Sequence, residues 1–245
     1  MRVGLVGVGL VGGSLALALR LTHDVVAYDS DASVRASARA RGLTIVDALA
    51  GVLPADAVVV ATPFTAIVPT LRELAERADG AVLIDVGSLK RPVAAYAETA
   101  PARARIVGGH PMAGTTGAGF ASADPSLFRG RPFLLVPTAR SDARALDVAS
   151  ALARAVGAEP TVCSAEAHDR AIATLSGVPL AVAIALAKSG EDVARFAGPG
   201  FRDATRLAAT PPELAEVLLR GNRDEVKDAL RRFREALDDV ERGLG

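Results

Sequence analysis

The sequence predicts an α/β fold in which an N-terminal Rossmann-type domain, built on a doubly wound parallel sheet, precedes an all-helical domain. Short apolar segments alternate with helical segments in the first part of the chain, as is typical of parallel strands joined by crossover helices. From residue 165 onward strand patterns stop and helical periodicity continues to the end. We therefore expect one domain at residues 1–163 and a second at residues 164–245.

Local sequence patterns place each element. Runs rich in valine, isoleucine and leucine predict strands at residues 2–6, 25–28, 57–61, 81–84, 106–107, 133–136 and 159–162. Periodicity and stop signals predict helices at residues 14–21, 33–41, 66–78 and 142–156. In the second domain we expect a helix at 171–187 that is apolar almost all round and a charged amphipathic helix at 223–242.

The charge balance argues against two classes of partner. The chain has 28 lysines and arginines and 28 aspartates and glutamates, so its formal net charge is zero, and it has no basic tract. We therefore expect no nucleic-acid partner and no anionic membrane surface. The single cysteine, Cys163, excludes an internal disulfide and a multi-cysteine metal site, and it fits a reducing, cytoplasmic setting. We expect no metal.

Two apolar segments share features with membrane elements. The N-terminal run has an arginine before apolar residues, as a signal peptide does, but residues 1–21 contain five glycines. The apolar helix at residues 171–187 is shorter than the roughly 20 residues that cross a bilayer, and it contains Ser176, Gly177 and Pro179. We expect it to be buried in the helical domain or at a subunit interface.

A glycine-rich motif between the first strand and the first helix predicts a dinucleotide site. The motif consists of Gly7, Val8, Gly9, Leu10, Val11 and Gly12. Asp29 ends the next strand, at the spacing of the Rossmann fingerprint, where its carboxylate accepts hydrogen bonds from the adenine ribose. A 2′-phosphate would meet that negative charge, so NAD is favoured over NADP. The alternative is an ordinary strand-to-helix turn with an exposed aspartate.

Polar residues follow two later strands. Thr62 and Pro63 come after the strand at 57–61, and Ser88 comes after the strand at 81–84. In a doubly wound sheet ligands bind beyond the carboxyl ends of the strands, so we expect these residues near the cofactor. Each has a structural alternative, because Thr62 and Ser88 are also good helix caps and proline is common in a first helical turn.

A histidine stands in the unusual stretch GGHPMAG, residues 108–114. His110 follows the predicted strand at 106–107, which ends at the same edge of the sheet. Transfer of a hydride from a carbinol carbon requires a base for the hydroxyl proton, and a neutral imidazole is suited to that task near neutral pH. We interpret His110 as that base, with Ser88 holding it. The alternative is a surface histidine without a catalytic role.

Four segments resemble those of the prephenate/arogenate dehydrogenases of tyrosine biosynthesis. They read GVGLVGGSLALAL, DVGSLK, GGHPMAGT and GFRDATRLA, in the family's order and over nearly the whole chain. The resemblance implies an NAD(P)-binding domain and a helical dimerisation domain, hence a homodimer. It also implies NAD-dependent oxidative decarboxylation of prephenate to 4-hydroxyphenylpyruvate, with arogenate, or both compounds, as the alternative substrate.

The resemblance also assigns site residues. It implies that His110 accepts the C4 hydroxyl proton, that Ser88 orients His110, and that hydride passes from C4 to NAD. Arg206 matches the arginine that binds a substrate carboxylate, which suits a bidentate guanidinium. Thr115, Thr116 and Ser176 match positions at the substrate.

The chain departs from the family at three positions. Many members have a Ser-His-Leu-Pro-His stretch where this chain has Ser176-Gly177-Val178-Pro179-Leu180, and many have glutamate at the position of Thr116. These changes affect the side-chain end of the substrate. His168 also matches the family pattern, and we interpret it mainly as a helix-start residue.

Two other classes of protein stay open. A different two-domain dehydrogenase or imine reductase would usually place a catalytic lysine or aspartate in the helical domain, where Lys188 is the nearest lysine. A non-catalytic NAD-binding sensor would not need Ser88 and His110 at the nicotinamide end of the cofactor.

Overall fold

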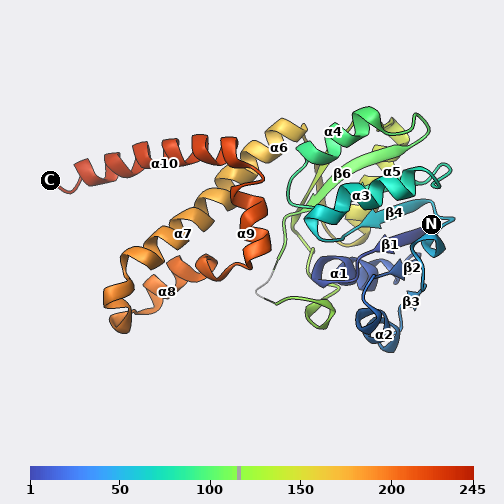
Figure 1. The fold of residues 1–245 in the computed structure, drawn as a ribbon, viewed down its shortest axis with the longest axis horizontal. Helices are drawn as coiled ribbons and strands as arrows, with labels where there is room; N and C mark the ends of the chain where they lie inside the picture. Colours follow the sequence, from blue (N-terminus) through green and yellow to red (C-terminus); the bar gives the residue numbers. More distant parts are fainter. Residues whose placement is uncertain (115–116) are drawn as a thin grey trace. The chain divides into compact units, whose positions relative to one another are not determined.

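The computed structural model describes residues 1–114 and 117–245, and Thr115 and Thr116 lie outside the described residues. The chain divides into two compact units, Met1–Ala165 and Glu166–Gly245. The first carries all the strands among the described residues and the second is helical (Figure 1). Each unit is described by itself below.

The first unit is built on one sheet of eight strands in the order β3-β2-β1-β4-β5-β6-β7-β8. The strands are β1 (Arg2–Val6), β2 (Asp24–Tyr28), β3 (Thr44–Ile45), β4 (Ala57–Val60), β5 (Val82–Asp85), β6 (Arg105–Pro111), β7 (Pro132–Pro137) and β8 (Glu159–Val162). Strands β1 to β6 pair in parallel, β7 is antiparallel to β6, and β8 is parallel to β7. Residues 112–114 and 117–131, the described part of the connection from β6 to β7, contain no α-helix. A parallel strand would need a crossover connection, usually a helix, to return the chain to the other end of the sheet, so β7 runs antiparallel to β6.

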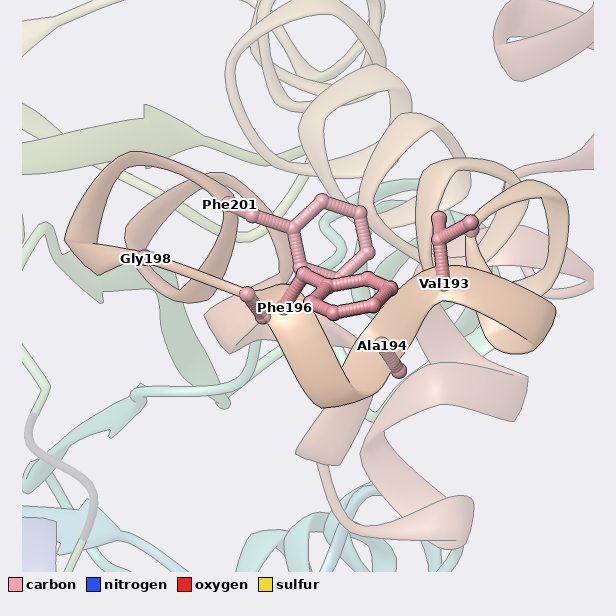
Figure 2. A pocket seen from close by; sticks show the side chains of 7 residues that line it. Val193, Ala194, Phe196, Gly198 and Phe201 are labelled. Carbon is pink, nitrogen blue, oxygen red and sulfur yellow. The ribbon is translucent and has the colours of Figure 1, made fainter.

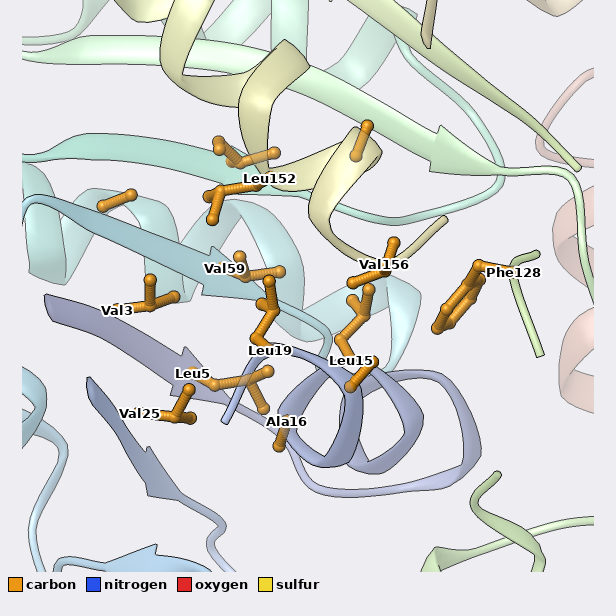
Figure 3. Close-up of a cluster of buried hydrophobic side chains, with 14 of the residues drawn as sticks. Val3, Leu5, Leu15, Ala16, Leu19, Val25, Val59, Phe128, Leu152 and Val156 are labelled. Atoms are coloured by element: carbon orange, nitrogen blue, oxygen red, sulfur yellow. The ribbon is translucent and has the colours of Figure 1, made fainter. Parts of the chain in front are cut away.

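Helices cover both faces of this sheet (Figure 1). They are α1 (Leu10–Leu19), α2 (Ala32–Ala40), α3 (Phe64–Ala75), α4 (Arg91–Thr99) and α5 (Ala143–Ala155), with short 3₁₀ turns at Leu49–Val52 and Phe120–Ser122. Alternate residues of the central strands β1, β4, β5 and β6 enter two separate hydrophobic clusters, as expected for strands buried on both faces. One cluster joins α1, α2 and α5, and Figure 3 shows α1 and α5 side chains meeting those of β1, β2 and β4. The other joins α3 and α4.

The predicted doubly wound sheet is confirmed, and several boundaries move. Helix α1 begins at Leu10, inside the glycine-rich motif, rather than at Ser14. Strand β6 extends to Pro111 and contains His110, which we had placed in a loop after a shorter strand. The two-residue strand β3 was not predicted, because a strand that short carries no alternation to detect.

The second unit consists of helices packed around one long helical segment. Its elements are α6 (Ala165–Ile172), a π-helical turn at Ala173–Gly177, α7 (Val178–Ser189), α8 (Pro199–Thr205), α9 (Pro212–Leu219) and α10 (Arg223–Arg242), with 3₁₀ turns at Glu191–Phe196 and Arg206–Ala209. Helix α7 contacts α8 and α10, and the π-helical turn contacts α9 and α10. The predicted charged helix is α10, with the bounds expected.

The apolar helix of this unit is longer than expected. It runs without a break over Ala165–Ser189, 25 residues, and by length and composition it could cross a membrane. The expectation that it is too short to span a bilayer is therefore wrong, because α6, the π-helical turn and α7 join into one helix. One third of its most apolar window (33%) is buried within the chain.

A shallow apolar hollow lies beside α7 and α8. It is lined by Gly190, Val193, Ala194, Phe196, Ala197, Gly198 and Phe201. Figure 2 shows the rings of Phe196 and Phe201 next to each other over this hollow. None of the lining side chains is titratable or polar, so the hollow has no group that could transfer a proton.

The packing of α1 yields a matched pair of variants. Leu19 is 1% exposed within the first cluster, whereas Leu21, two residues later, is 72% exposed. Leu19→Ala should reduce the free energy of unfolding by about 2–5 kcal/mol, because it leaves a cavity between α1 and the sheet. Leu21→Ala should change it by less than about 0.5 kcal/mol. Urea unfolding followed by circular dichroism measures both, and equal losses would show that α1 does not pack as described.

Candidate active site

The turn between β1 and α1 leaves room for a ligand beside Gly9. Gly7 has φ +89°, a left-handed conformation that glycine adopts without strain. A Cβ atom on Gly12 would lie 1.9 Å from the Gly7 carbonyl oxygen, so only glycine allows this approach of helix to strand. A Cβ atom on Gly9 would meet nothing within 4 Å. The turn therefore fits a pyrophosphate at the N-terminus of α1.

The Asp29 carboxylate lies beside this turn, at the end of β2. Its Oδ2 atom accepts a hydrogen bond from the Val8 N–H at 2.7 Å, and its Oδ1 atom accepts one from the Asp31 N–H at 2.9 Å. Each carboxylate oxygen can accept more than one hydrogen bond, so the group can also accept from the two hydroxyls of a ribose. The geometry fits NAD, because a 2′-phosphate at the same place would be repelled.

Thr62 offers an unpaired hydroxyl at the end of β4. Helix α3 begins at Phe64 with Pro63 as its N-cap and without a side-chain capping bond, so the interpretation of Thr62 as a helix cap is wrong. The Thr62 Oγ1 atom is buried and has no hydrogen-bond partner among the described residues. A buried hydroxyl left without a partner is costly, so this atom fits a hydrogen bond to a bound ligand.

Ser88 lies three residues beyond the end of β5 and is half-buried. Helix α4 begins at Arg91 with Lys90 as its N-cap and without a side-chain capping bond. Ser88 is therefore not the cap of α4, and the structural alternative for this residue is also wrong. Its predicted role in orienting His110 stays a prediction.

His110 lies at the same edge of the sheet, in the last part of β6. Pairing between β5 and β6 ends at Asp85 and Gly108, and His110 pairs only with Leu134 of β7. The imidazole is half-buried. Side chains two residues apart in a strand point the same way, so His110 faces the side on which Gly108 meets the Lys90 side chain.

A buried ion pair next to His110 was not predicted from the sequence. The Lys90 ammonium donates a hydrogen bond to Asp85 Oδ2 and another, at 2.6 Å, to the Gly109 carbonyl oxygen. Both charged side chains are 0% exposed. The signal that could have found it is Asp85 at the end of an apolar strand, which needs a counter-charge if it is buried.

The two glycines before His110 allow close packing at the end of β6. A Cβ atom on Gly108 would lie 2.9 Å from Lys90 Cδ, and a Cβ atom on Gly109 would lie 2.6 Å from the Asp85 carbonyl oxygen. Larger residues would push β6 away from β5 and from the lysine. Gly108 therefore leaves room for the Lys90 side chain, and Gly109 allows β6 to approach the β5 backbone.

Two opposing effects act on the pKa of the Asp85 carboxyl group. Burial raises the pKa of Asp85, and the Lys90 ammonium together with the Gly87 and Gly109 backbone opposes that rise. The Gly87 N–H donates to Asp85 Oδ2 at 2.8 Å. Asp85 belongs to β5, Lys90 lies at the start of α4, and the lysine also binds Gly109 of β6. The pair therefore joins these three elements one residue before His110.

The predicted substrate residues of the helical unit are exposed or half-buried. Arg206 starts the 3₁₀ turn after α8 and is exposed. Within the described part of the chain it forms no ion pair with Asp203 or Glu213, the two partners that a purely structural arginine would use. Ser176 lies in the π-helical turn and is half-buried. Thr115 and Thr116 lie outside the described residues, so their predicted contacts are not described.

Gly177 stands where many family members have a histidine, and its surroundings leave no room for one. A Cβ atom there would lie 2.7 Å from Val226 Cγ2 of α10. Leu180, the position of the second missing histidine, is 2% exposed and packs in the interior. Helix packing in this chain therefore occupies the space at position 177. Gly177 is the last residue of the π-helical turn, a feature often found at functional sites.

His168 is more than a helix-start residue. It lies inside α6 and is 1% exposed, and its Nδ1 atom is 2.7 Å from Asp169 Oδ1. The Asn222 side chain donates to the Asp169 carbonyl oxygen at 2.7 Å. These contacts tie α6 to the segment before α10, which is a structural role. No group of three histidine, cysteine, aspartate or glutamate side chains in residues 1–114 and 117–245 is arranged to hold a metal ion.

The sheet edge of the first unit therefore combines a dinucleotide turn, a threonine hydroxyl without a partner among the described residues, a serine, and a histidine one residue after the carbonyl group that the buried lysine binds. This combination fits a dinucleotide-dependent dehydrogenase, in which the role of His110 as proton acceptor stays a prediction.

Comparison with known proteins identifies the family. The nucleotide-binding domain of prephenate dehydrogenase matches residues 15–162, and the dimerization domain of prephenate dehydrogenase matches residues 164–244. The chain therefore belongs to the prephenate dehydrogenase family. Prephenate dehydrogenase from Bacillus subtilis (strain 168) is 33% identical over 257 residues, which cover 97% of this chain and 68% of that protein.

Two solved structures are similar over nearly the full chain. Arogenate dehydrogenase from Synechocystis is 30% identical with a TM-score of 0.85, covering 98% of this chain and 90% of that one. Prephenate dehydrogenase from A. aeolicus, solved with hydroxyphenyl propionate and NAD+, is 27% identical with a TM-score of 0.90, covering 99% and 90%. The chain is a prephenate or arogenate dehydrogenase in its fold and family.

The buried ion pair makes a testable prediction. Lys90→Met keeps the length of the side chain but leaves the Asp85 carboxylate buried without its counter-charge. The free energy of unfolding should fall by about 3–5 kcal/mol. Asp85→Asn combined with Lys90→Met should recover much of this loss, because it removes the isolated charge. Urea unfolding of the three proteins measures the effect, and a double variant as unstable as the single one would contradict it.

The same variant should change how stability depends on pH. Without Lys90, only the Gly87 and Gly109 backbone opposes the effect of burial, so the pKa of Asp85 rises further above that of the unfolded chain. The folded state then binds the proton more tightly than the unfolded state, so stability is highest at low pH and falls as pH rises. The deficit of Lys90→Met relative to the unmodified chain should therefore be larger at about pH 8 than at about pH 5. Equal deficits would mean that Asp85 is not the group responsible.

Proposed function

We propose that this chain is an NAD-dependent prephenate dehydrogenase that converts prephenate to 4-hydroxyphenylpyruvate and carbon dioxide in the cytoplasm. The observation that carries the proposal is the position of His110. It lies at the same edge of the sheet as the dinucleotide turn and Thr62, in a chain that matches both domains of the family. The match to both domains favours this function over an imine reductase or an NAD-binding sensor.

The proposed reaction needs one base, one hydride acceptor and one leaving group. NAD, when bound at the glycine turn, supplies the acceptor for the hydride from C4 of the substrate. His110 takes the proton of the C4 hydroxyl group, so that C4 becomes a carbonyl carbon as the hydride departs. Loss of the ring carboxylate as carbon dioxide then leaves its electron pair in the ring, which becomes aromatic when the carbonyl is protonated to the phenol.

The remaining site residues bind and orient. We assign to Ser88 the orientation of the His110 imidazole, and to Arg206 the binding of a substrate carboxylate, because a guanidinium binds carboxylates through two parallel hydrogen bonds. Thr115, Thr116 and Ser176 are proposed as further substrate contacts. Val8, Leu10 and Val11 contribute backbone groups to the cofactor turn, with Gly7, Gly9 and Gly12 giving it its shape.

Arogenate is the second candidate substrate, because the similar Synechocystis enzyme is an arogenate dehydrogenase. The two compounds differ at the side chain, which carries a keto group in prephenate and an amino group in arogenate. Positions 116, 177 and 180, where this chain departs from many relatives, concern that end of the substrate.

Parallel assays of NADH formation with prephenate and with arogenate test the function. We expect NADH with prephenate, together with one carbon dioxide for each NADH. NADH with arogenate alone would overturn the choice of substrate but not the reaction class. No NADH with either compound would overturn the proposed function.

We also propose that the chain forms a homodimer through its helical unit. Phe233, Leu237, Val240 and Leu244 are exposed at helical spacing along and just beyond α10, and residues 164–244 match a dimerization domain. Light scattering at micromolar concentration should give about twice the mass of the 25.0 kDa chain. A mass of one chain would contradict the dimer.

His110→Asn should keep the fold and NAD binding but lower kcat by about 100-fold or more, because the amide cannot accept the hydroxyl proton. Steady-state assays with prephenate and binding of NADH, measured in the same preparation, separate the two effects. Turnover close to that of the unmodified enzyme would exclude His110 as the base.

Arg206→Ala should raise KM for prephenate more than it lowers kcat, because the carboxylate contact exists in both the ground state and the transition state. The expected loss in kcat/KM is about 30- to 1,000-fold. Arg206→Lys should recover only part of it, because an ammonium cannot form the two parallel bonds. Arg202→Ala serves as the control in the same helical segment. An unchanged KM in Arg206→Ala would move substrate binding to another residue.

A further inference from the structure

Two arginines lie next to the carboxylate that we assign to the adenine ribose. The Arg35 Nη1 atom donates hydrogen bonds to the Asp29 carbonyl oxygen at 2.8 Å and to the Ser30 carbonyl oxygen at 3.0 Å. Its guanidinium also lies over the Tyr28 ring, 6.0 Å from the centroid. Arg39 follows one turn later on α2, with its Nη2 atom 3.2 Å from the Ile45 carbonyl oxygen.

One exposed carboxylate engages both arginines. The Asp47 Oδ1 atom lies 2.6 Å from Arg39 Nη2 and 3.5 Å from Arg35 Nε. The hydrogen bond and the charge of Arg39 lower the pKa of Asp47, with a smaller contribution from Arg35. Asp47 therefore carries its negative charge throughout the neutral range. It lies after β3, the strand next to β2, and is 76% exposed.

The difference between NAD and NADP is a phosphate group at this place. NADP carries a 2′-phosphate on the adenine ribose, and dinucleotide folds accommodate it with an arginine near the end of the second strand. This chain has such arginines, and the Asp47 carboxylate offsets part of their positive charge. A phosphate placed here would meet the charges of Asp29 and Asp47 together.

We propose that Asp47 is a second determinant of cofactor choice, which acts by holding Arg35 and Arg39 away from a 2′-phosphate and by adding its own negative charge beside Asp29. The inference rests on the proposed use of NAD. It assigns the preference to a group of four charged residues rather than to Asp29 alone.

A purely structural role for Asp47 makes a different prediction. The two ion pairs link α2 to the segment after β3, so removal of Asp47 would then lower thermal stability slightly and affect both cofactors equally. The ratio of NADPH to NADH affinity therefore separates the two roles, because a structural change would not alter it.

The experiment measures binding of NADH and NADPH to the full-length chain by nucleotide fluorescence, without substrate. The variants are Asp29→Ser, Asp47→Asn and the combination of both. Asp228→Asn is the matched control, because Asp228 is also an exposed aspartate paired with an arginine, Arg231, but lies on α10 in the other unit. Melting temperatures of all variants show whether each is folded.

We expect Asp47→Asn to bind NADPH about three- to tenfold more tightly, with NADH affinity changed by less than about twofold. The combination with Asp29→Ser should exceed the product of the two single effects, because the released arginines and the lost repulsion act on the same phosphate. Adding Arg39→Ala should remove most of the gain, because Arg39 is the arginine that hydrogen-bonds to Asp47. The gain should also shrink at high salt, since the group is exposed.

Three outcomes would overturn the inference. NADPH affinity in Asp47→Asn that matches Asp228→Asn would show that Asp47 has no part in cofactor choice. Equal gains for NADH and NADPH would assign Asp47 a general electrostatic or structural role. Failure of the unmodified chain to bind NADH would overturn the proposed function and this inference together. In the first two outcomes the unmodified chain still binds NADH, so the NADH measurement separates them from the third.

Discussion

The buried pair of Asp85 and Lys90 is the interaction on which the candidate site depends. Burying the Asp85 carboxylate at the end of a strand costs free energy unless a positive charge lies beside it. The Lys90 ammonium supplies that charge, but it too is buried and needs a further hydrogen-bond acceptor on the backbone. Its second acceptor is the carbonyl group of Gly109, one residue before His110. The lysine that balances Asp85 at the end of β5 is thus also bound by the backbone of β6, at Gly109.

Small residues also gather at this edge of the sheet. Gly108 and Gly109 allow β6 to approach the lysine and β5, and Gly12 allows α1 to approach the turn that begins at Gly7. Close approach of backbones brings the cofactor turn and the histidine to one edge, at the ends of parallel strands. Polar groups then have fixed positions there, which is what proton and hydride transfer require.

The sequence predicted the doubly wound sheet and the cofactor turn because these follow from local patterns. Alternation of strand and helix is visible along the chain, and the glycine spacing with Asp29 is a local signature. The Asp85–Lys90 pair was not predicted, because it forms no short-range motif. Lys90 binds a carboxylate five residues before it and a carbonyl oxygen nineteen residues after it, and only the folded sheet brings these groups together. The lengths of β6 and of the apolar helix were also misjudged, since antiparallel pairing with β7 and a π-helical turn extend segments that the sequence alone suggests should end.

Charge placement finally explains why substrate recognition is assigned away from the sheet edge. Prephenate carries two carboxylates, and the buried cation nearest His110 is Lys90, whose ammonium is already paired with Asp85. Such a pair is internally neutral and enclosed, so it offers little attraction to an incoming anion. Arg206 is exposed and, within the described residues, makes no ion pair with its acidic neighbours Asp203 and Glu213. A guanidinium in that state keeps its charge and its hydrogen-bond donors for a carboxylate, whereas the buried lysine uses its charge to balance Asp85 and to bind the Gly109 carbonyl oxygen.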